Sequence, residues 1–220
     1  MFLAAVARQQ ICAGAKPRGR SRGRGTRNFF TLPTLGGFSL QKQYRDTLVF
    51  PFSREQVFQV VADVDRYSEF VPMCVGSKVL PGSLRTDHQV LSMNPETQRA
   101  EPISRRCMQA ELVVGYPPFN ERYTSSVELE HPWRIVATAA PGSAMFKHMR
   151  TVWEFAENRP RQGEAPANPF ILPASTLVSF SIEFEFASLV HAQTASLVFD
   201  HMAKRNLAAY LGRCQHLHGR

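Results

Sequence analysis

Apolar and polar residues alternate with a period of two through several segments of the chain. Every even-numbered residue from 178 to 186 is Val, Ile or Phe, and every odd-numbered one is Ser or Glu. This alternation is typical of antiparallel strands that bury one face. The pattern predicts seven strands, and six of them can be delimited at residues 43–50, 108–116, 123–129, 135–139, 149–155 and 178–186.

Two short helices are expected directly after the first strand. Ser53 and Gln56 form a capping box, and valines then recur at helical spacing as far as Val64. A second short helix is expected over Asp65–Phe70, because Pro72 cannot continue it.

A long amphipathic helix is expected from Ser188 to about Gly212, where apolar residues follow three- and four-residue spacing without a proline. The pattern therefore predicts an α+β fold in which a curved seven-stranded antiparallel sheet wraps around this C-terminal helix. Ala192, Ala195 and Ala209 on the apolar stripe are small, so we expect a cavity between helix and sheet. An ordinary filled core is the alternative interpretation.

Two segments lack a regular pattern and are expected to be loops inserted between strands. Ser83–Ser104 is polar, and Glu157–Pro173 is rich in proline and asparagine.

The net charge of +8 is concentrated at one end of the chain. Residues 1–45 carry nine Lys or Arg and no acid, whereas the remaining residues carry 17 basic and 18 acidic side chains. An Arg-rich, acid-free segment that opens with a short apolar stretch is typical of a mitochondrial presequence, expected over residues 1–29 and removed by cleavage. The Arg-Gly alternation at residues 18–25 leaves an RNA-binding tail as an alternative. A secretory signal is disfavoured because Arg8 interrupts its apolar core.

After the presequence we expect a linker at residues 30–42, one folded domain at 43–214 and a tail at 215–220. The domain is almost neutral, so nucleic acid is not an expected partner. Cys74, Cys107 and Cys214 are widely spaced and form no metal-binding motif, so neither a disulfide framework nor a metal site is predicted. We also expect no catalytic cofactor, since neither a nucleophile–base pair nor a phosphate-binding glycine loop stands out.

Three stretches resemble the mitochondrial coenzyme Q-binding proteins of the START-like superfamily. They are Tyr67-Ser68-Glu69-Phe70-Val71-Pro72-Met73-Cys74, the segment from Val114 to Ser125, and the end of the chain from Phe180 to Tyr210. The resemblance implies a helix-grip fold whose cavity holds ubiquinone or a related polyprenyl lipid. It also implies a non-enzymatic lipid chaperone on the matrix side of the mitochondrial inner membrane, attached peripherally. Such a protein would serve respiratory electron transfer and coenzyme Q biosynthesis, with respiratory complexes or biosynthetic enzymes as possible partners.

Matching the family position by position implies a set of ligand-binding residues. Inward-facing residues of the last predicted strand and of the long helix are added to this set. A quinone head only accepts hydrogen bonds, so Tyr123, Trp153 and Asn206 are the candidate donors. The expected ligand-binding residues are Val71, Pro72, Leu112, Tyr116, Pro117, Tyr123, Trp153, Phe180, Phe184, Phe199, Met202 and Asn206.

A lipid this insoluble must enter from the bilayer, and Pro141–Arg150 is the expected gate. Met145 and Phe146 would dip into the interface while Lys147 and Arg150 meet anionic head groups. Phe170–Leu172 is the second choice, and a solvated turn is the alternative interpretation.

Two other functions stay open on the sequence. Similar helix-grip proteins act as polyketide cyclases and aromatases, which would require an acid or base inside the cavity. Bacterial relatives are linked to ribosomes, which the Arg-Gly segment would suit and the neutral domain would not.

Overall fold

The computed structural model describes residues 40–94, 97–116, 119–144, 146–158 and 175–219. The helices are α1 (Arg54–Ala62), the 3-10 turn η1 (Val64–Arg66), α2 (Tyr67–Phe70) and α3 (Leu189–His218). The strands are β1 (Gln41–Phe50), β2 (Cys74–Val79), β3 (Arg85–Met93), β4 (Ala100–Tyr116), β5 (Phe119–Glu130), β6 (Arg134–Ala139), β7 (Phe146–Glu157) and β8 (Thr176–Phe186).

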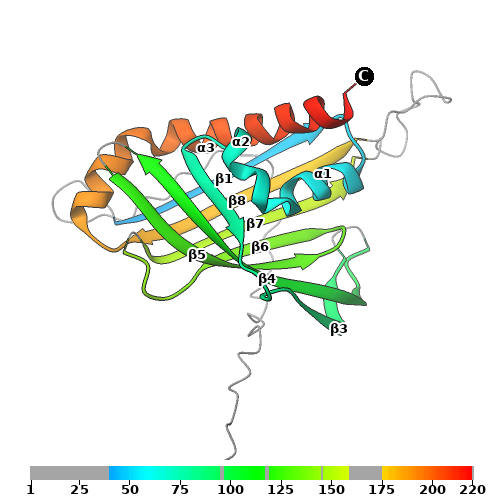
Figure 1. Ribbon diagram of the computed structural model, residues 1–220. Coiled ribbons are helices and arrows are strands. Elements are labelled where there is room, and N and C mark those ends of the chain that lie inside the picture. The colour runs from blue at the N-terminus through cyan, green and yellow to red at the C-terminus, as the bar shows by residue number, and fades with distance from the viewer. Residues whose placement is uncertain (1–39, 95–96, 117–118, 145, 159–174, 220) are drawn as a thin grey trace, which may run out of the picture.

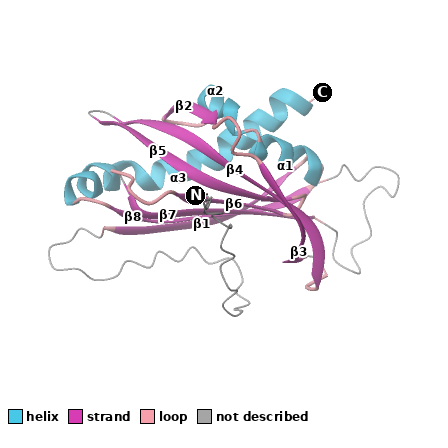
Figure 2. Ribbon diagram, turned by 60° about the horizontal axis from the view of Figure 1, so that its bottom comes forward, coloured by secondary structure: helices cyan, strands magenta, loops and turns pink. Residues whose placement is uncertain are grey.

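The strands form one antiparallel sheet in the order β1-β8-β7-β6-β5-β4-β2, and β3 pairs with β4 outside this path. The sheet curves, and α3 lies along its inner side together with the short helices α1 and α2 (Figure 1). In the turned view, β5 runs above α3 and β1, β7 and β8 run below it, as expected for a sheet that curls around the helix (Figure 2). The predicted α+β fold with a sheet gripping a C-terminal helix is therefore confirmed.

The alternation along β8 produces the buried face as expected. Val178, Phe180, Phe184 and Phe186 are buried, whereas Glu183 on the other side is exposed. These side chains join a core in which Phe50, Phe58 and Phe155 are almost completely inaccessible to solvent. Burying each such aromatic side chain contributes about 1.5–3 kcal/mol relative to leaving it exposed.

The capping box at α1 is also present. The Ser53 hydroxyl accepts a hydrogen bond from the backbone N–H of Gln56 at 3.3 Å. In return, the Gln56 side-chain oxygen accepts one from the backbone N–H of Ser53 at 2.9 Å. These bonds satisfy two donors that a helix N-terminus otherwise leaves unpaired, and thereby fix where α1 begins.

The expectation that Ser83–Ser104 is a loop is wrong. This segment supplies β3 and the first residues of β4, so the sheet has eight strands rather than seven. In the pairing, Val90 lies opposite Ile103 and Leu91 lies opposite Pro102. Leu91 is 69% exposed, because this hairpin extends beyond the part of the sheet that α3 covers (Figure 1). A strand whose apolar side chains are exposed, and whose buried residue is the polar Ser92, does not show the alternation on which the prediction relied.

The predicted end of the long helix is also wrong. Gly212 was expected to end it, but α3 continues to His218, so four residues of the expected 215–220 tail are helical. A side chain at Gly212 would meet no atom within 4 Å, so the glycine occupies an open position on the helix rather than a cap. The extra turns cover the core, since Cys214 is fully buried.

Residues 1–39 and 159–174 lie outside the described residues, and so do the expected presequence and most of the proline-rich segment. The described chain begins just before β1, whose first residue, Gln41, precedes the expected start by two positions. Among the residues that the structure describes, no helix is long and apolar enough to cross a bilayer.

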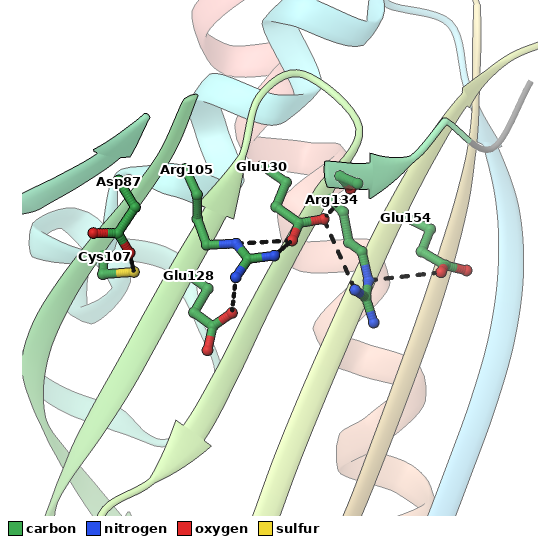
Figure 3. A network of polar contacts seen from close by, with 8 residues as sticks. Asp87, Arg105, Cys107, Glu128, Glu130, Arg134 and Glu154 are labelled. Atoms are coloured by element: carbon green, nitrogen blue, oxygen red, sulfur yellow. Dashed lines mark hydrogen bonds and ion pairs between the residues drawn. The ribbon is translucent and has the colours of Figure 1, made fainter. Parts of the chain in front are cut away.

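A buried carboxylate holds the projecting β3–β4 hairpin to the sheet. Glu130, at the end of β5, is only 2% exposed. It accepts a hydrogen bond from Nε of Arg105 at 3.0 Å and another from the Ser92 hydroxyl of β3 at 2.6 Å. Arg134 of β6 flanks the same carboxylate at 3.8 Å, and its Nε lies 3.8 Å from Glu154 (Figure 3). This network therefore connects β3, β4, β5 and β6.

We expect Glu130→Ala to lower the free energy of unfolding by about 3 kcal/mol, because Arg105 would remain buried with only the more distant Glu128, at 3.8 Å, to compensate its charge. Glu154→Ala is the matched control: it removes an exposed carboxylate near the same network and should cost less than about 1 kcal/mol. Urea denaturation of both variants measures the difference. Equal losses would show that the Glu130 network contributes no more than a surface ion pair.

Candidate functional site

A cavity of about 130 Å³ lies between the curved sheet and α3. The sheet contributes most of its wall, and α2 and α3 close it from the other side. Its lining is predominantly apolar and aromatic. The described residues that line it are Val64, Tyr67, Val71, Leu112, Tyr123, Ser125, Val127, Ile135, Ala137, Met149, Thr151, Trp153, Phe180, Ile182, Asn206 and Tyr210.

Small side chains on the central strands leave this space. Ser125 of β5, Ala137 of β6 and Thr151 of β7 line the cavity among larger residues of the same strands, such as Tyr123, Ile135 and Trp153. The helical alanines play a different part from the one expected. Ala192 is buried in an aromatic cluster beside the cavity, and Ala209 is not among the lining residues. The Ala195 side chain lies outside the described residues.

The volume of the cavity limits what it can hold. Pockets for drug-sized ligands usually measure about 300–1,000 Å³, whereas an apolar cavity of about 150 Å³ is sufficient for benzene. A space of about 130 Å³ therefore matches a single six-membered ring. A long hydrocarbon chain attached to that ring would need additional room.

Two tyrosines close the cavity at the junction of α2 and α3. The Tyr210 hydroxyl is hydrogen-bonded to that of Tyr67, which itself donates to the backbone oxygen of Val61 at 2.5 Å. Their rings also meet edge to face, with centroids 5.5 Å apart. Burial raises the pKa of both hydroxyls well above the ordinary tyrosine value, so both remain protonated donors.

Two other polar groups of the lining form no hydrogen bond with the described part of the protein. Oδ1 of Asn206 is buried and accepts no hydrogen bond. The Tyr123 hydroxyl donates none within the described structure, and burial raises its pKa, which keeps it protonated. Ser125 differs, because its hydroxyl donates to the backbone oxygen of Thr138 at 3.3 Å. The cavity therefore offers an acceptor and a donor to a guest molecule.

An aromatic cluster, formed by Tyr123, Phe146, Phe184 and Phe186, lies beside the cavity. Phe146 stands at its centre, with ring centroids 5.5 Å from both Tyr123 and Phe184. Phe184 and Phe186 meet edge to face at 4.8 Å. Tyr123 lines the cavity as well, so the cluster continues the same hollow toward the first turn of α3.

The structure brings half of the sequence-predicted ligand-binding residues to this cavity. Phe184 lies next to it in the aromatic cluster, whereas Pro72 is half-buried beside Val71 but is not part of the lining. Pro117 and the side chains of Tyr116, Phe199 and Met202 lie outside the described residues. The predicted residues that line the cavity are Val71, Leu112, Tyr123, Trp153, Phe180 and Asn206.

The expected gate residues do not form one exposed loop. β7 begins at Phe146, which packs into the aromatic cluster, so its side chain is directed into the fold. Nζ of Lys147 lies 3.1 Å from Glu185, and this carboxylate compensates its charge. Arg150 lies within β7, half-buried and opposite Glu183. Met145 is outside the described residues.

Several residues that line the cavity were not predicted as site residues from the sequence. Ser125 and Ala137 stood at inward positions of predicted strands, and small residues there were the signal of unfilled space. Tyr67 and Tyr210 lay within the motifs of the resemblance without being chosen as site residues. Within the described residues, no group of three or more His, Cys, Asp or Glu side chains could hold a metal ion.

The sequence matches the family described as "Polyketide cyclase / dehydrase and lipid transport" over residues 50–210. The chain is 31% identical over 196 residues to the mitochondrial coenzyme Q-binding protein COQ10 homolog B of Xenopus laevis, covering 88% of this chain and 66% of the relative. It is 29% identical to the mitochondrial coenzyme Q-binding protein of Drosophila melanogaster, covering 68% of this chain and 48% of the relative. This chain thus spans between about half and two thirds of the length of these two relatives.

A more distant similarity connects the chain to the ribosome association toxin RatA of Vibrio cholerae, at 26% identity with 81% of this chain and 99% of the relative covered. Among solved structures, the Zhui aromatase/cyclase from a Streptomyces species superposes with a TM-score of 0.56 at 13% identity, covering 80% of this chain and 94% of that chain. At such low identity the superposition shows only that the two folds are similar. The superposition supports the START-like helix-grip fold. The match over residues 50–210 shows that the chain belongs to the polyketide cyclase/dehydrase and lipid transport family.

Proposed function

We propose that this protein binds ubiquinone, or a late precursor of it, in the cavity beneath α3. In this proposal it acts as a non-enzymatic lipid carrier that supports respiratory electron transport and coenzyme Q biosynthesis. The observation that carries the proposal is a ring-sized apolar cavity with unpaired polar groups, in a chain similar to proteins named for coenzyme Q binding.

The physical fit supports a ring with an isoprenoid tail. Each isoprene unit removes five carbons from water, worth up to about 4 kcal/mol at about 0.8 kcal/mol per carbon. The cavity accommodates the ring, so the tail must run through the adjoining hollow now filled by Phe146, Phe184 and Phe186. Rotation of these side chains toward the surface would open a path between the start of β7 and the start of α3.

A carrier role accords with the chemistry of the cavity wall. Cyclases need an acid or base beside the substrate. The described lining contains Tyr, Ser, Thr, Trp and Asn as its polar residues, and neither a carboxylate nor a histidine belongs to it. The polar residues suit hydrogen bonding to a ring oxygen, which a carrier requires.

The proposed location is the matrix side of the mitochondrial inner membrane, to which the protein attaches peripherally. The Arg-rich, acid-free segment before residue 46 and the mitochondrial names of the relatives support this location. Respiratory complexes or enzymes of coenzyme Q synthesis are the proposed partners.

The surface beside the aromatic cluster suits contact with a membrane. Leu189 and Val190, in the first turn of α3, are 57% and 59% exposed, and they follow Phe186 closely in the chain. Exposed apolar side chains of this kind enter the interfacial region of a bilayer. Because Lys147 is paired with Glu185, we assign the attraction chiefly to this apolar pair rather than to the basic residues of the expected gate.

Extraction of the purified protein with organic solvent, followed by mass spectrometry, should identify a polyprenyl quinone or quinone precursor. We expect Leu112→Glu to abolish this co-purification, because it places a charge in the wall of the cavity. Leu91→Glu, on the exposed β3, is the matched control and should retain the lipid. Full retention of quinone by a folded Leu112→Glu protein would mean that the lipid binds elsewhere.

We further expect the double variant Leu189→Ser with Val190→Ser to lose at least about half of its binding to cardiolipin-containing liposomes. The control is Leu91→Ser with Met93→Ser, a similarly exposed apolar pair at the opposite end of the molecule (Figure 1). Cosedimentation measures both. If the β3 variant loses binding and the α3 variant keeps it, the membrane-facing end has been assigned wrongly.

A further inference from the structure

Asn206 places a buried acceptor at the wall of the cavity. Its Oδ1 is shielded from solvent and accepts no hydrogen bond, although Asn206 is one of the two α3 residues in the described lining. A buried polar atom without a partner destabilises the folded protein, so such atoms usually face a ligand or an ordered water. This atom therefore indicates what a bound molecule must supply.

The protein's own donors in the cavity do not satisfy it. The Tyr67 hydroxyl donates to Val61, and the Tyr210 hydroxyl is bonded to Tyr67. The Ser125 hydroxyl is directed to the backbone of Thr138. A guest that satisfies Asn206 Oδ1 must accordingly donate a hydrogen bond.

We propose that the cavity selects the hydroxylated form of its ring ligand, a quinol or phenolic precursor, over the oxidised quinone. This inference rests on the proposed function. A quinone oxygen only accepts hydrogen bonds, whereas a quinol hydroxyl donates to Asn206 and can also accept from the Tyr123 hydroxyl.

Rotation of the Asn206 amide does not remove this selectivity. In either orientation the amide presents an oxygen that only accepts and an N–H group that only donates. Only a ligand that both donates and accepts can satisfy the amide in full. Sites built to bond a hydroxyl discriminate strongly against the analogue that lacks it.

The test compares decylubiquinol with decylubiquinone under anaerobic conditions, with the full chain and with tryptophan fluorescence as the signal of binding, since Trp153 lines the cavity. We expect the quinol to bind roughly tenfold more tightly, the effect of one satisfied buried acceptor. As an independent readout, the midpoint potential of the bound two-electron couple should rise by about 30 mV relative to the free couple.

Three variants separate the contributions. Asn206→Leu should bring the two dissociation constants to a ratio of about one, since no acceptor remains. Asn158→Leu is the matched control, because Asn158 is exposed and does not line the cavity, and it should keep the preference. Tyr123→Phe should weaken both forms by a similar factor, because each accepts from that hydroxyl.

Equal affinities in the unmodified protein would overturn the inference while leaving the proposed function intact. A preference for quinol that survives in Asn206→Leu, with its melting transition preserved, would also overturn it. Failure of both forms to bind would instead overturn the proposed function, and this inference with it.

Discussion

The structure depends on a mismatch between a broad curved sheet and the single long helix that packs against it. A sheet that twists and curls encloses more volume than one helix can fill with side chains. The short helices α1 and α2 and the buried phenylalanines occupy most of the hollow, as the complete burial of Phe50 and Phe155 illustrates. Where the small side chains of Ser125, Ala137 and Thr151 stand among larger ones, the side chains do not fill the space between sheet and helix, and a cavity remains.

The curved sheet also separates charged groups from neutral polar groups. Glu130, Arg105 and Arg134 bring buried charge to the end of the sheet where β3 and β4 project, and each charge there has a partner of opposite sign (Figure 3). The cavity wall holds only neutral polar groups. The paired charges that anchor the projecting hairpin therefore lie apart from the cavity wall.

Period-two alternation was sufficient to predict the strands that bury one face, which is why β8 and the grip architecture could be read from the sequence. It failed for β3, because the apolar Leu91 and Met93 are exposed there and the buried residue between them is the polar Ser92. The helical spacing of α3, in turn, assigned the spare volume to alanines of the helix rather than to Ser125 and Ala137. The size of a void depends on how opposing side chains meet across the core, and the spacing along one strand does not contain that information.

The extra turns of α3 also determine the reactivity of the chain's last cysteine. Cys214 lies one helical turn beyond Tyr210, and its burial raises the pKa of the thiol to about 12. Since the thiolate is the species that oxidants and electrophiles attack, this sulfur is almost entirely in its inert form near neutral pH. A molecule bound beside Tyr210 would therefore meet, one helical turn away, a thiol that does not react with it.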